Sequence, residues 1–311
     1  MATRLPIVID TDPGQDDALA ILLALGLPER FEVVAVTAVA GNVPVAQTAA
    51  NAKRITELAG RPELPVYAGC AAPMVLPLVT AEFVCGPDGL AGAGLPPPAT
   101  PFAAGHAVTA LLDLLRAAPS EGLTICALGP LTNIAMALRL APDLVERIAS
   151  IVVMGGAMAL GNITPAAEYN FYADPHAAAV VLNAGRPVTL LGLHATHQAI
   201  ATPETLELFA AMGTHTGRSV HGMLTRPRAS GLGTTGHPVH DACVIGMLAW
   251  PDLFRGRDCA VEIDISDGRL RGRSTIDWHG RLRLNPNAHV IDQIDSPEFF
   301  ARMIAALRHL P

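Results

Sequence analysis

The chain has 311 residues, of which 50% are hydrophobic and 16% are charged, so a globally disordered protein is excluded and one large core can be buried. The formal net charge is −7, which excludes the strongly basic surface expected of a nucleic-acid-binding protein. Lys53 is the only lysine, so a phosphate-binding loop that depends on a lysine is excluded as well.

Strands and helices are expected to alternate from the N-terminus onward. Residues 5–10 predict a buried strand, and residues 16–26 predict a helix that ends at Gly26. The same order repeats, with strands expected at 31–39, 122–129, 147–156 and 187–193, helices at 45–60, 131–140 and 174–185, then short strands at 259–265 and 271–278 and a helix at 296–308. Continuous apolar strands between such helices predict an α/β fold. We expect a single domain over residues 1–311, built on a mostly parallel open sheet with helices on both faces.

Three stretches interrupt this alternation: 69–105, which is rich in Pro and Gly, the polar stretch 155–170, and the stretch of small residues 229–238. Loops of this length inside a compact domain are usually functional or disordered.

The cysteines and the N-terminus bear on the compartment. The chain has five cysteines, and none of them forms a C-x-x-C pair, which argues against a disulfide framework or a zinc–cysteine site and favours a reducing compartment. The first twelve residues contain only a very short apolar stretch, and Gly and Pro interrupt the longer ones. We therefore expect a cytoplasmic protein with no membrane partner and no nucleic-acid partner.

Four carboxylates lie within eight residues where the first strand gives way to the first helix: Asp10, Asp12, Asp16 and Asp17. A helix N-terminus favours nearby acidic side chains, which explains one or two of the four. Carboxylates this close repel one another unless a cation lies among them. Because all of the ligands on offer are hard oxygens, the cluster predicts a calcium or magnesium site rather than zinc or copper.

Further polar residues follow other expected strands. Asn42 follows the second strand, and Leu128 follows the third. The loop after the fourth strand contains Asn162, Glu168 and Asn170. Open parallel sheets bind ligands at the carboxyl ends of their strands. We therefore expect all of these residues to meet at one edge of the sheet.

The acidic segment and several others make the sequence resemble the inosine-uridine preferring nucleoside hydrolases. The segments that carry the resemblance run in order along nearly the whole chain: D-T-D-P-G-Q-D-D-A (10–18), T-A-V-A-G-N (37–42), A-L-G-P-L-T-N-I-A (127–135), V-V-M-G-G-A (152–157), 161–178 and H-P-V-H-D-A-C (237–243). The resemblance implies hydrolysis of the N-glycosidic bond of ribonucleosides to free base and ribose, through an oxocarbenium-like transition state.

The resemblance also implies roles for individual residues. One calcium ion per subunit is expected on Asp12, Asp17, the main-chain carbonyl of Leu128, and Asp241. Asp12 is also expected to act as the general base on the attacking water. His240 is expected to protonate or contact the leaving base. The residues expected to hold the ribose hydroxyls are Asp16, Asn42, Asn162, Glu168 and Asn170. A homodimer or homotetramer is expected as well.

Other positions remain open at the level of sequence. Asp10 either orients the acidic loop from behind or caps the turn at the strand end. Cys85 stands where many relatives carry a histidine, and it is either a site residue or a small buried one. Residues 212–238 are expected to line the base pocket without a Tyr or Trp, which leaves Phe83 as an aromatic contact and the choice between purines and pyrimidines undecided. His237 is expected to face solvent.

Two alternatives are weighed against the hydrolase. A phosphohydrolase of the haloacid dehalogenase type also has D-x-D after its first strand, but it needs a later basic residue for the phosphate. A non-catalytic nucleoside-binding or ribose-binding protein needs the residues that grip the diol but no base. Replacement of Asp12 by Asn distinguishes the binding protein from the nucleoside hydrolase. The binding protein keeps much of its affinity, whereas the hydrolase loses turnover.

Overall fold

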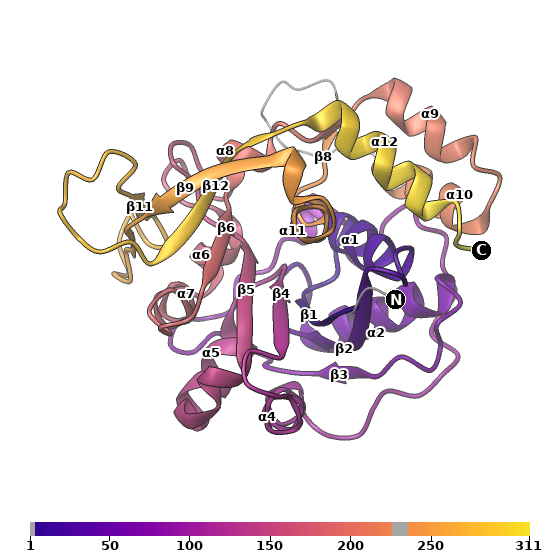
Figure 1. The fold of residues 1–311 in the computed structure, drawn as a ribbon. Coiled ribbons are helices and arrows are strands. Elements are labelled where there is room, and N and C mark those ends of the chain that lie inside the picture. Colours follow the sequence, from indigo (N-terminus) through magenta and orange to yellow (C-terminus); the bar gives the residue numbers. More distant parts are fainter. Residues whose placement is uncertain (1–3, 226–235) are drawn as a thin grey trace.

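A twisted, mostly parallel sheet forms the centre of the computed structural model, which describes residues 4–225 and 236–311 (Figure 1). Within these residues the main sheet holds eight strands in the order β3-β2-β1-β4-β5-β6-β12-β9. Only the edge pairing of β12 with β9 is antiparallel. The strands are β1 (Leu5–Thr11), β2 (Phe31–Ala38), β3 (Val66–Ala68), β4 (Leu123–Ala127), β5 (Ile148–Met154), β6 (Val188–Leu191), β9 (Phe254–Cys259) and β12 (Ala288–Ile294). The predicted α/β fold is confirmed.

The chain reverses its direction of travel across the sheet between β1 and β4. From β1 it moves outward through β2 to β3, and after β3 it returns to the other side of β1 and continues through β4, β5 and β6. In open parallel sheets such a switch point leaves a crevice at the carboxyl ends of the two central strands. The acidic segment after β1 and Leu128 after β4 both lie at this crevice.

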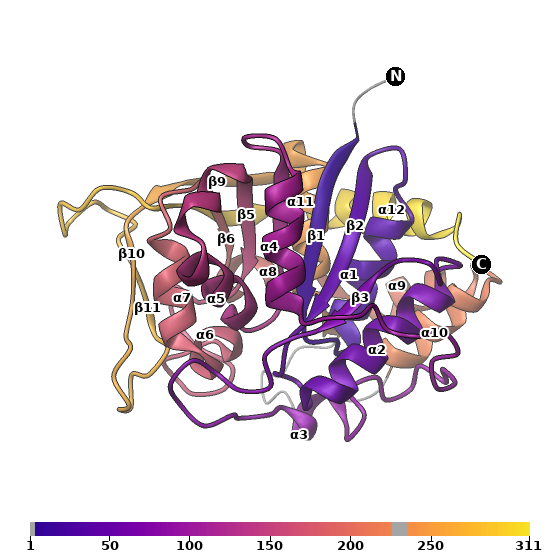
Figure 2. The same ribbon diagram turned by 90° about the horizontal axis from the view of Figure 1, so that it is seen from below.

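Helices cover both faces of the sheet, as Figure 2 shows from below. One apolar core lies beneath α1, α2, α10, α11 and α12, and a second lies beneath α4, α5 and α7. The helices of the first face are α1 (Gln15–Leu25), α2 (Val45–Leu58), α10 (His215–Leu224), α11 (Ala242–Ala249) and α12 (Ser296–Leu307), and those of the second are α4 (Ala107–Ala117), α5 (Thr132–Leu140) and α7 (Pro175–Leu182).

Helix α1 shows how the core orients the site. All of its residues from Gln15 to Leu25 are buried, because the helix packs on the sheet and against helices α2, α10, α11 and α12. Because the helix makes contacts on all sides, its orientation is fixed, and its N-terminus is directed at the switch point. Asp16 and Asp17, in its first turn, are therefore held at the carboxyl edge of the sheet.

Smaller elements complete the described structure. They are α3 (Glu82–Cys85), α6 (Tyr169–Ala173), α8 (Leu193–Thr196), α9 (Pro203–Ala210), the 3-10 turns at Pro142–Arg147 and Pro251–Leu253, and the two-stranded sheets β7 (Ile200–Ala201) with β8 (His237–Pro238) and β10 (Val261–Ile263) with β11 (Ser274–Ile276). No helix of the described residues combines the length and the apolarity needed to cross a bilayer.

Some sequence-based expectations need correction. The strand expected at 259–265 is divided between the end of β9 and β10, and the strand expected at 271–278 is only Ser274–Ile276. Elements including β3, α4, α11 and β12 were not predicted. In β12, polar His289 and Gln293 alternate with buried residues because this strand lies next to the edge of the sheet, and that pattern hides a strand. The single-domain organisation stays a prediction.

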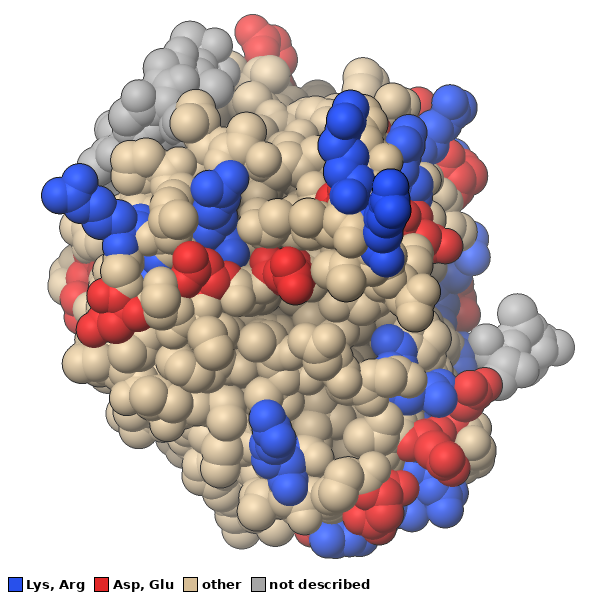
Figure 3. Space-filling view, turned by 90° about the vertical axis from the view of Figure 1, so that its left-hand side faces the viewer, with Lys and Arg blue, Asp and Glu red and all other residues tan. Residues whose placement is uncertain are grey.

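On the side of the molecule that Figure 3 shows, basic and acidic side chains are interspersed over a mostly neutral surface. This face therefore presents mixed charge rather than a continuous basic stripe of the kind that binds a phosphate backbone.

Candidate active site

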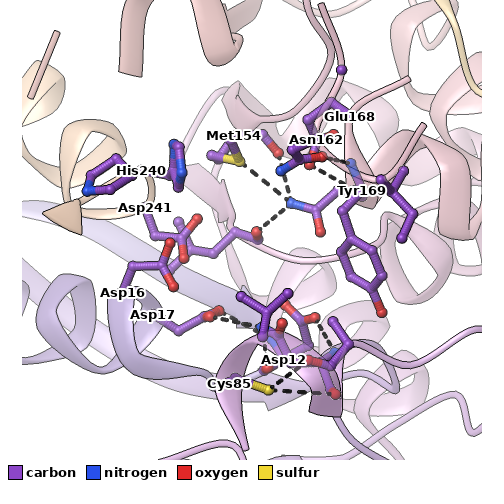
Figure 4. A pocket seen from close by; sticks show the side chains of 18 of the residues that line it. Asp12, Asp16, Asp17, Cys85, Met154, Asn162, Glu168, Tyr169, His240 and Asp241 are labelled. Atoms are coloured by element: carbon purple, nitrogen blue, oxygen red, sulfur yellow. Dashed lines mark hydrogen bonds between the residues drawn. The ribbon is translucent and has the colours of Figure 1, made fainter. Parts of the chain in front are cut away.

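A cavity of about 340 Å³ lies at the switch point, and nearly all of the residues singled out from the sequence line it (Figure 4). Its lining includes side chains from segments that lie far apart in the sequence but meet at the carboxyl edge of the sheet. The predicted residues among them are Asp12, Asp16, Asp17, Asn42, Phe83, Cys85, Leu128, Asn162, Glu168, Asn170, His240 and Asp241. The structure therefore brings all of these residues together at one edge of the sheet, as expected.

Asp12 occupies a slot between two glycines. A Cβ atom on Gly41 would lie 2.0 Å from Asp12 Oδ2, and one on Gly129 would lie 2.3 Å from Asp12 Oδ1. The backbone N–H of Asn42 donates to Asp12 Oδ2 at 2.7 Å, which fixes the carboxylate within the slot. The two glycines are therefore required for space, since any other residue would displace Asp12.

Asp17 is held by a set of neutral donors. Its Oδ1 accepts from Thr11 Oγ1 at 2.6 Å, and its Oδ2 accepts from the Gly14 N–H at 3.0 Å and from Asn42 Nδ2 at 3.3 Å. These donors come from the turn that joins β1 to α1 and from the end of β2, so the D-T-D-P-G-Q-D-D segment folds back onto its own last carboxylate.

Three buried carboxylates come together at the floor of the cavity. Asp16, Asp17 and Asp241 each offer an oxygen, and these oxygens all lie within 4.8 Å of one another. Burial raises the pKa of Asp241 well above its ordinary value, and the neighbouring Asp17 and Asp16 raise it further. Burial, followed by the charge of Asp16, likewise raises the pKa of Asp17.

This arrangement is what a site for a hard cation requires. The charged forms of Asp17 and Asp241 are disfavoured on their own, and a cation among these side chains reverses that preference. All of the donors are oxygens, and the main-chain carbonyl of Leu128 lies in the same cavity. Asp12 is not part of the group of three, although it lines the cavity beside them, and burial followed by the charge of Asp17 raises its pKa well above the ordinary value.

Opposite the acidic floor, a wall of amides and one carboxyl group lines the cavity. Asn170 Nδ2 donates to the Leu128 carbonyl at 2.7 Å and to the Met154 carbonyl at 3.1 Å. Asn162 Oδ1 accepts from the N–H of Tyr169 at 2.9 Å. Glu168 caps the N-terminus of α6 by accepting from the N–H groups of Asn170 and Phe171.

Glu168 is also a group whose charge is disfavoured. It is 2% exposed, and its burial raises its pKa to about 7. The N–H groups of Asn170, Gly156 and Phe171 offset part of this shift because they donate to the carboxylate.

His240 lies beside the acidic floor and is held in place by α8. Its Nδ1 makes a hydrogen bond of 2.8 Å with Thr196 Oγ1, and its ring meets that of His197 edge-on, with the centroids 5.3 Å apart. His197 is not among the residues singled out from the sequence, yet it lines the cavity. No sequence pattern marks this residue, because its approach to His240 is a contact between segments more than 40 positions apart.

One other expectation about this region is wrong. His237 does not face solvent, because it lies in β8, which pairs with β7, and is only 3% exposed. In the segment expected to line the base pocket, Pro238 lines the cavity, whereas helix α10 packs Val220, Met223 and Leu224 into the core. Residues 226–235 of the same segment lie outside the described structure.

The remaining wall is apolar and includes an aromatic residue that sequence reasoning missed. Tyr169 lines the cavity between Glu168 and Asn170, and its hydroxyl donates to the Val79 carbonyl at 2.8 Å. Phe83 also lines the cavity but is 62% exposed, whereas Cys85 is buried and its thiol lies 3.3 Å from the Ala81 carbonyl. Cys85 is thus a small buried residue that also forms part of the wall.

Asp10 lies behind the cavity and does not line it. It is fully buried, and its Oδ2 accepts from Thr37 Oγ1 at 2.6 Å and from Asn133 Nδ2 at 2.9 Å. Burial raises its pKa to about 7, and these two hydrogen bonds oppose the shift. Asp10 therefore ties the end of β1 to β2 and α5, which supports its interpretation as a residue that orients the acidic loop.

Comparison with known proteins defines the class to which this protein belongs. A sequence model described as "Inosine-uridine preferring nucleoside hydrolase" matches residues 7–301. The chain belongs to this family of nucleoside hydrolases, and it is a hydrolase that acts on N-glycosyl compounds with ribonucleosides as substrates.

Individual relatives cover nearly the whole chain. An uncharacterized protein of Schizosaccharomyces pombe is 43% identical over 98% of this chain and 99% of its own length. The pyrimidine-specific ribonucleoside hydrolase RihA of Salmonella gallinarum is 38% identical over the same shares. Among solved structures, the plant nucleoside hydrolase PpNRh1 aligns with a TM-score of 0.90 at 29% identity, over 99% of this chain and 100% of its own. The purine-preferring ribonucleoside hydrolase of Gardnerella vaginalis aligns with a TM-score of 0.89 at 29% identity, over 97% of this chain and 98% of its own.

Proposed function

We propose that the protein is a calcium-dependent ribonucleoside hydrolase that releases base and ribose through an oxocarbenium-like transition state. The observation that supports this most directly is the meeting of Asp16, Asp17 and Asp241 within 4.8 Å in a cavity whose opposite wall carries hydrogen-bonding amides. Such a cavity offers negative charge to a sugar that becomes cationic, and polar groups to its hydroxyls.

In this proposal calcium is held by Asp12, Asp17, Asp241 and the main-chain carbonyl of Leu128. When bound, calcium supplies Lewis acidity that favours ionisation of water and an attachment point for two vicinal hydroxyls. The oxygen donors and their mutual repulsion fit this ion better than a softer metal. We also propose one such ion per subunit, a homodimer or homotetramer, and a cytoplasmic location.

The chain's own residues carry the remaining steps. Asp12 accepts a proton from the attacking water, because its slot holds the carboxylate in one orientation. Once the site carries a cation, the raised pKa values of the acidic residues fall again, and Asp12 is ionised at neutral pH. His240, oriented by Thr196, contacts or protonates the departing base. The side chains that hold the ribose hydroxyls are those of Asp16, Asn42, Asn162, Glu168 and Asn170.

For the base, we propose a preference for pyrimidines. The RihA relatives at 38% identity are named as pyrimidine-specific, whereas the purine-preferring structure shares 29% identity. The panel of substrates should therefore include uridine, cytidine, inosine and adenosine, each measured with and without a calcium chelator. We expect ribose release to be fastest from the pyrimidine nucleosides and to be abolished by the chelator. Absence of ribose release from all four refutes the hydrolase.

The variant Asp12→Asn separates catalysis from binding. We expect kcat to fall by about 10²- to 10⁴-fold with nucleoside affinity largely kept, because the variant retains the shape of the side chain but loses the base. Asp113→Asn, an exposed position on α4, serves as the control. Nucleoside binding without turnover in the wild-type protein would indicate the binding protein instead, and phosphate release from sugar phosphates would indicate the phosphohydrolase.

A further inference from the structure

The β10–β11 hairpin lies outside the main sheet (Figure 1, left). It contacts helix α6, which carries part of the cavity wall. Arg271, which precedes β11, is only 7% exposed. Its Nε donates to the Tyr172 carbonyl at 2.9 Å, its Nη2 donates to the Ala173 carbonyl at 3.3 Å, and its guanidinium lies 4.3 Å from the centre of the Tyr172 ring. The side chain is therefore buried against the C-terminal end of α6.

This contact matters because α6 has only five residues. A helix of this length is not stable alone, and its last carbonyls have no partners within the helix. Glu168 satisfies N–H groups at the N-terminal end, and the planar fork of Arg271 satisfies two carbonyls at the other end. A lysine could reach only one of the two carbonyls in the same geometry.

Two residues that follow Arg271 bring the hairpin close to α6 and to the loop that precedes it. Gly272 has a φ of +73°, and a Cβ atom there would lie 2.5 Å from the Cα of Tyr172, so backbone packs on backbone. Ser274 Oγ accepts from the N–H of Ala157 and donates to its carbonyl, both at 2.8 Å. The N–H of the adjacent Gly156 donates to Glu168 Oε2 at 2.9 Å. The hairpin thus holds both α6 and the loop that leads to it.

We propose that the β10–β11 hairpin is a working part of the substrate site, and that Arg271 is a positioning residue that acts through α6 on Asn170 and Glu168. The inference rests on the proposed function, since those two side chains are the ones expected to hold ribose hydroxyls. Asn170 lies two positions before Tyr172 and is anchored on the carbonyls of Leu128 and Met154. Loss of the guanidinium leaves the end of α6 unsupported, and a misplacement of about 1 Å costs up to about 100-fold in rate.

The test compares Arg271→Ala with Arg269→Ala, which removes an exposed arginine from the same hairpin. We expect kcat/KM for ribonucleosides to fall by about 10- to 100-fold in the first variant and to change by less than about twofold in the second. Guanidinium ion at low concentration should restore part of the lost activity of Arg271→Ala, and urea should not. Values of kcat/KM within twofold of the wild type in Arg271→Ala overturn the proposal.

A double-mutant cycle with Asn170→Ala distinguishes positioning from general destabilisation. If Arg271 acts through α6, its removal should lower kcat/KM by a smaller factor in the Asn170→Ala background than in the wild type, whereas full additivity overturns the proposal. If Arg271→Ala fails to fold, Arg271→Lys decides, with an intermediate loss expected and wild-type kcat/KM as the contrary result.

Amide hydrogen exchange tests the contact without any assay of turnover. In Arg271→Ala we expect faster exchange confined to residues 168–174, with no such change in Arg269→Ala. Unchanged exchange in this segment overturns the proposal even if the wild-type enzyme is active. If the wild-type protein hydrolyses no ribonucleoside, the proposed function fails, and the exchange result still shows whether Arg271 holds α6.

Discussion

The carboxylates at the floor of the cavity lead to a prediction with opposite signs in two conditions. Asp241→Asn should stabilise the metal-free protein and should weaken its stabilisation by calcium. Oxygens of Asp16, Asp17 and Asp241 lie within 4.8 Å of one another. Two unit charges at that distance repel by about 3.5 kcal/mol at an effective dielectric constant of about 20. Asp241 takes part in two of the three pairs, so its neutralisation relieves about 7 kcal/mol when all three carboxylates are ionised.

The measured gain will be smaller than this value, because a repelled carboxylate can take up a proton instead. Each unit by which the pKa rises corresponds to about 1.4 kcal/mol, so we expect a gain of about 1 to 3 kcal/mol near pH 8 in excess chelator. With calcium at about 100 times its dissociation constant, the wild-type protein should gain about 2.7 kcal/mol. The variant, which lacks one ligand, should gain much less at the same calcium concentration.

Urea unfolding of both proteins, in chelator and in calcium, measures all four free energies. Asp267→Asn, an exposed position in the loop between β10 and β11, is the matched control for loss of one negative charge. It should change neither the unfolding free energy in chelator nor the gain in that free energy on addition of calcium. The reasoning is refuted if Asp241→Asn is no more stable than the wild type in chelator and responds to calcium as strongly. That result would mean that the three carboxylates neither repel one another nor share a cation.

Two further predictions concern Glu168 and Gly41. Burial raises the pKa of Glu168 from 4.5 to about 7, so its protonation stabilises the folded protein by about 3 kcal/mol below pH 4.5, and this stabilisation is lost as pH rises through 7. Urea unfolding in chelator should show the free energy of the wild type falling relative to that of Glu168→Gln between about pH 5 and pH 8; a constant difference contradicts the predicted shift. Gly41→Ala should lower the unfolding free energy by about 1 to 3 kcal/mol and abolish turnover, because the new Cβ would lie 2.0 Å from Asp12 Oδ2. The control is Gly268→Ala, whose Cβ would lie 3.5 Å from its nearest neighbour, and equal behaviour of the two variants would contradict the packing argument.

The sequence by itself determined the alternation of strands and helices and the side of the sheet on which the site lies. These features follow from local patterns, since apolar runs, helix-terminal glycines and the acidic residues after β1 are all read within a few positions. Because the carboxyl ends of parallel strands share one edge, Asp12, Asn42 and Leu128 could be assigned to one site without coordinates. Asp241 and His240 were assigned to the same site only through the family resemblance, which includes the H-P-V-H-D-A-C segment.

Only the tertiary structure decided which distant side chains meet. Asp10 pairs with Asn133 at a separation of 123 positions, and Asp16 and Asp17 meet Asp241 across most of the chain. Tyr169 becomes part of the cavity wall and Arg271 becomes the support of α6 for the same reason. Contacts of this kind depend on how helices and loops pack over the sheet, and the period of a local pattern carries no information about that packing. Sequence patterns therefore located the edge of the sheet at which the cavity lies, and three-dimensional packing decided how that edge is supported.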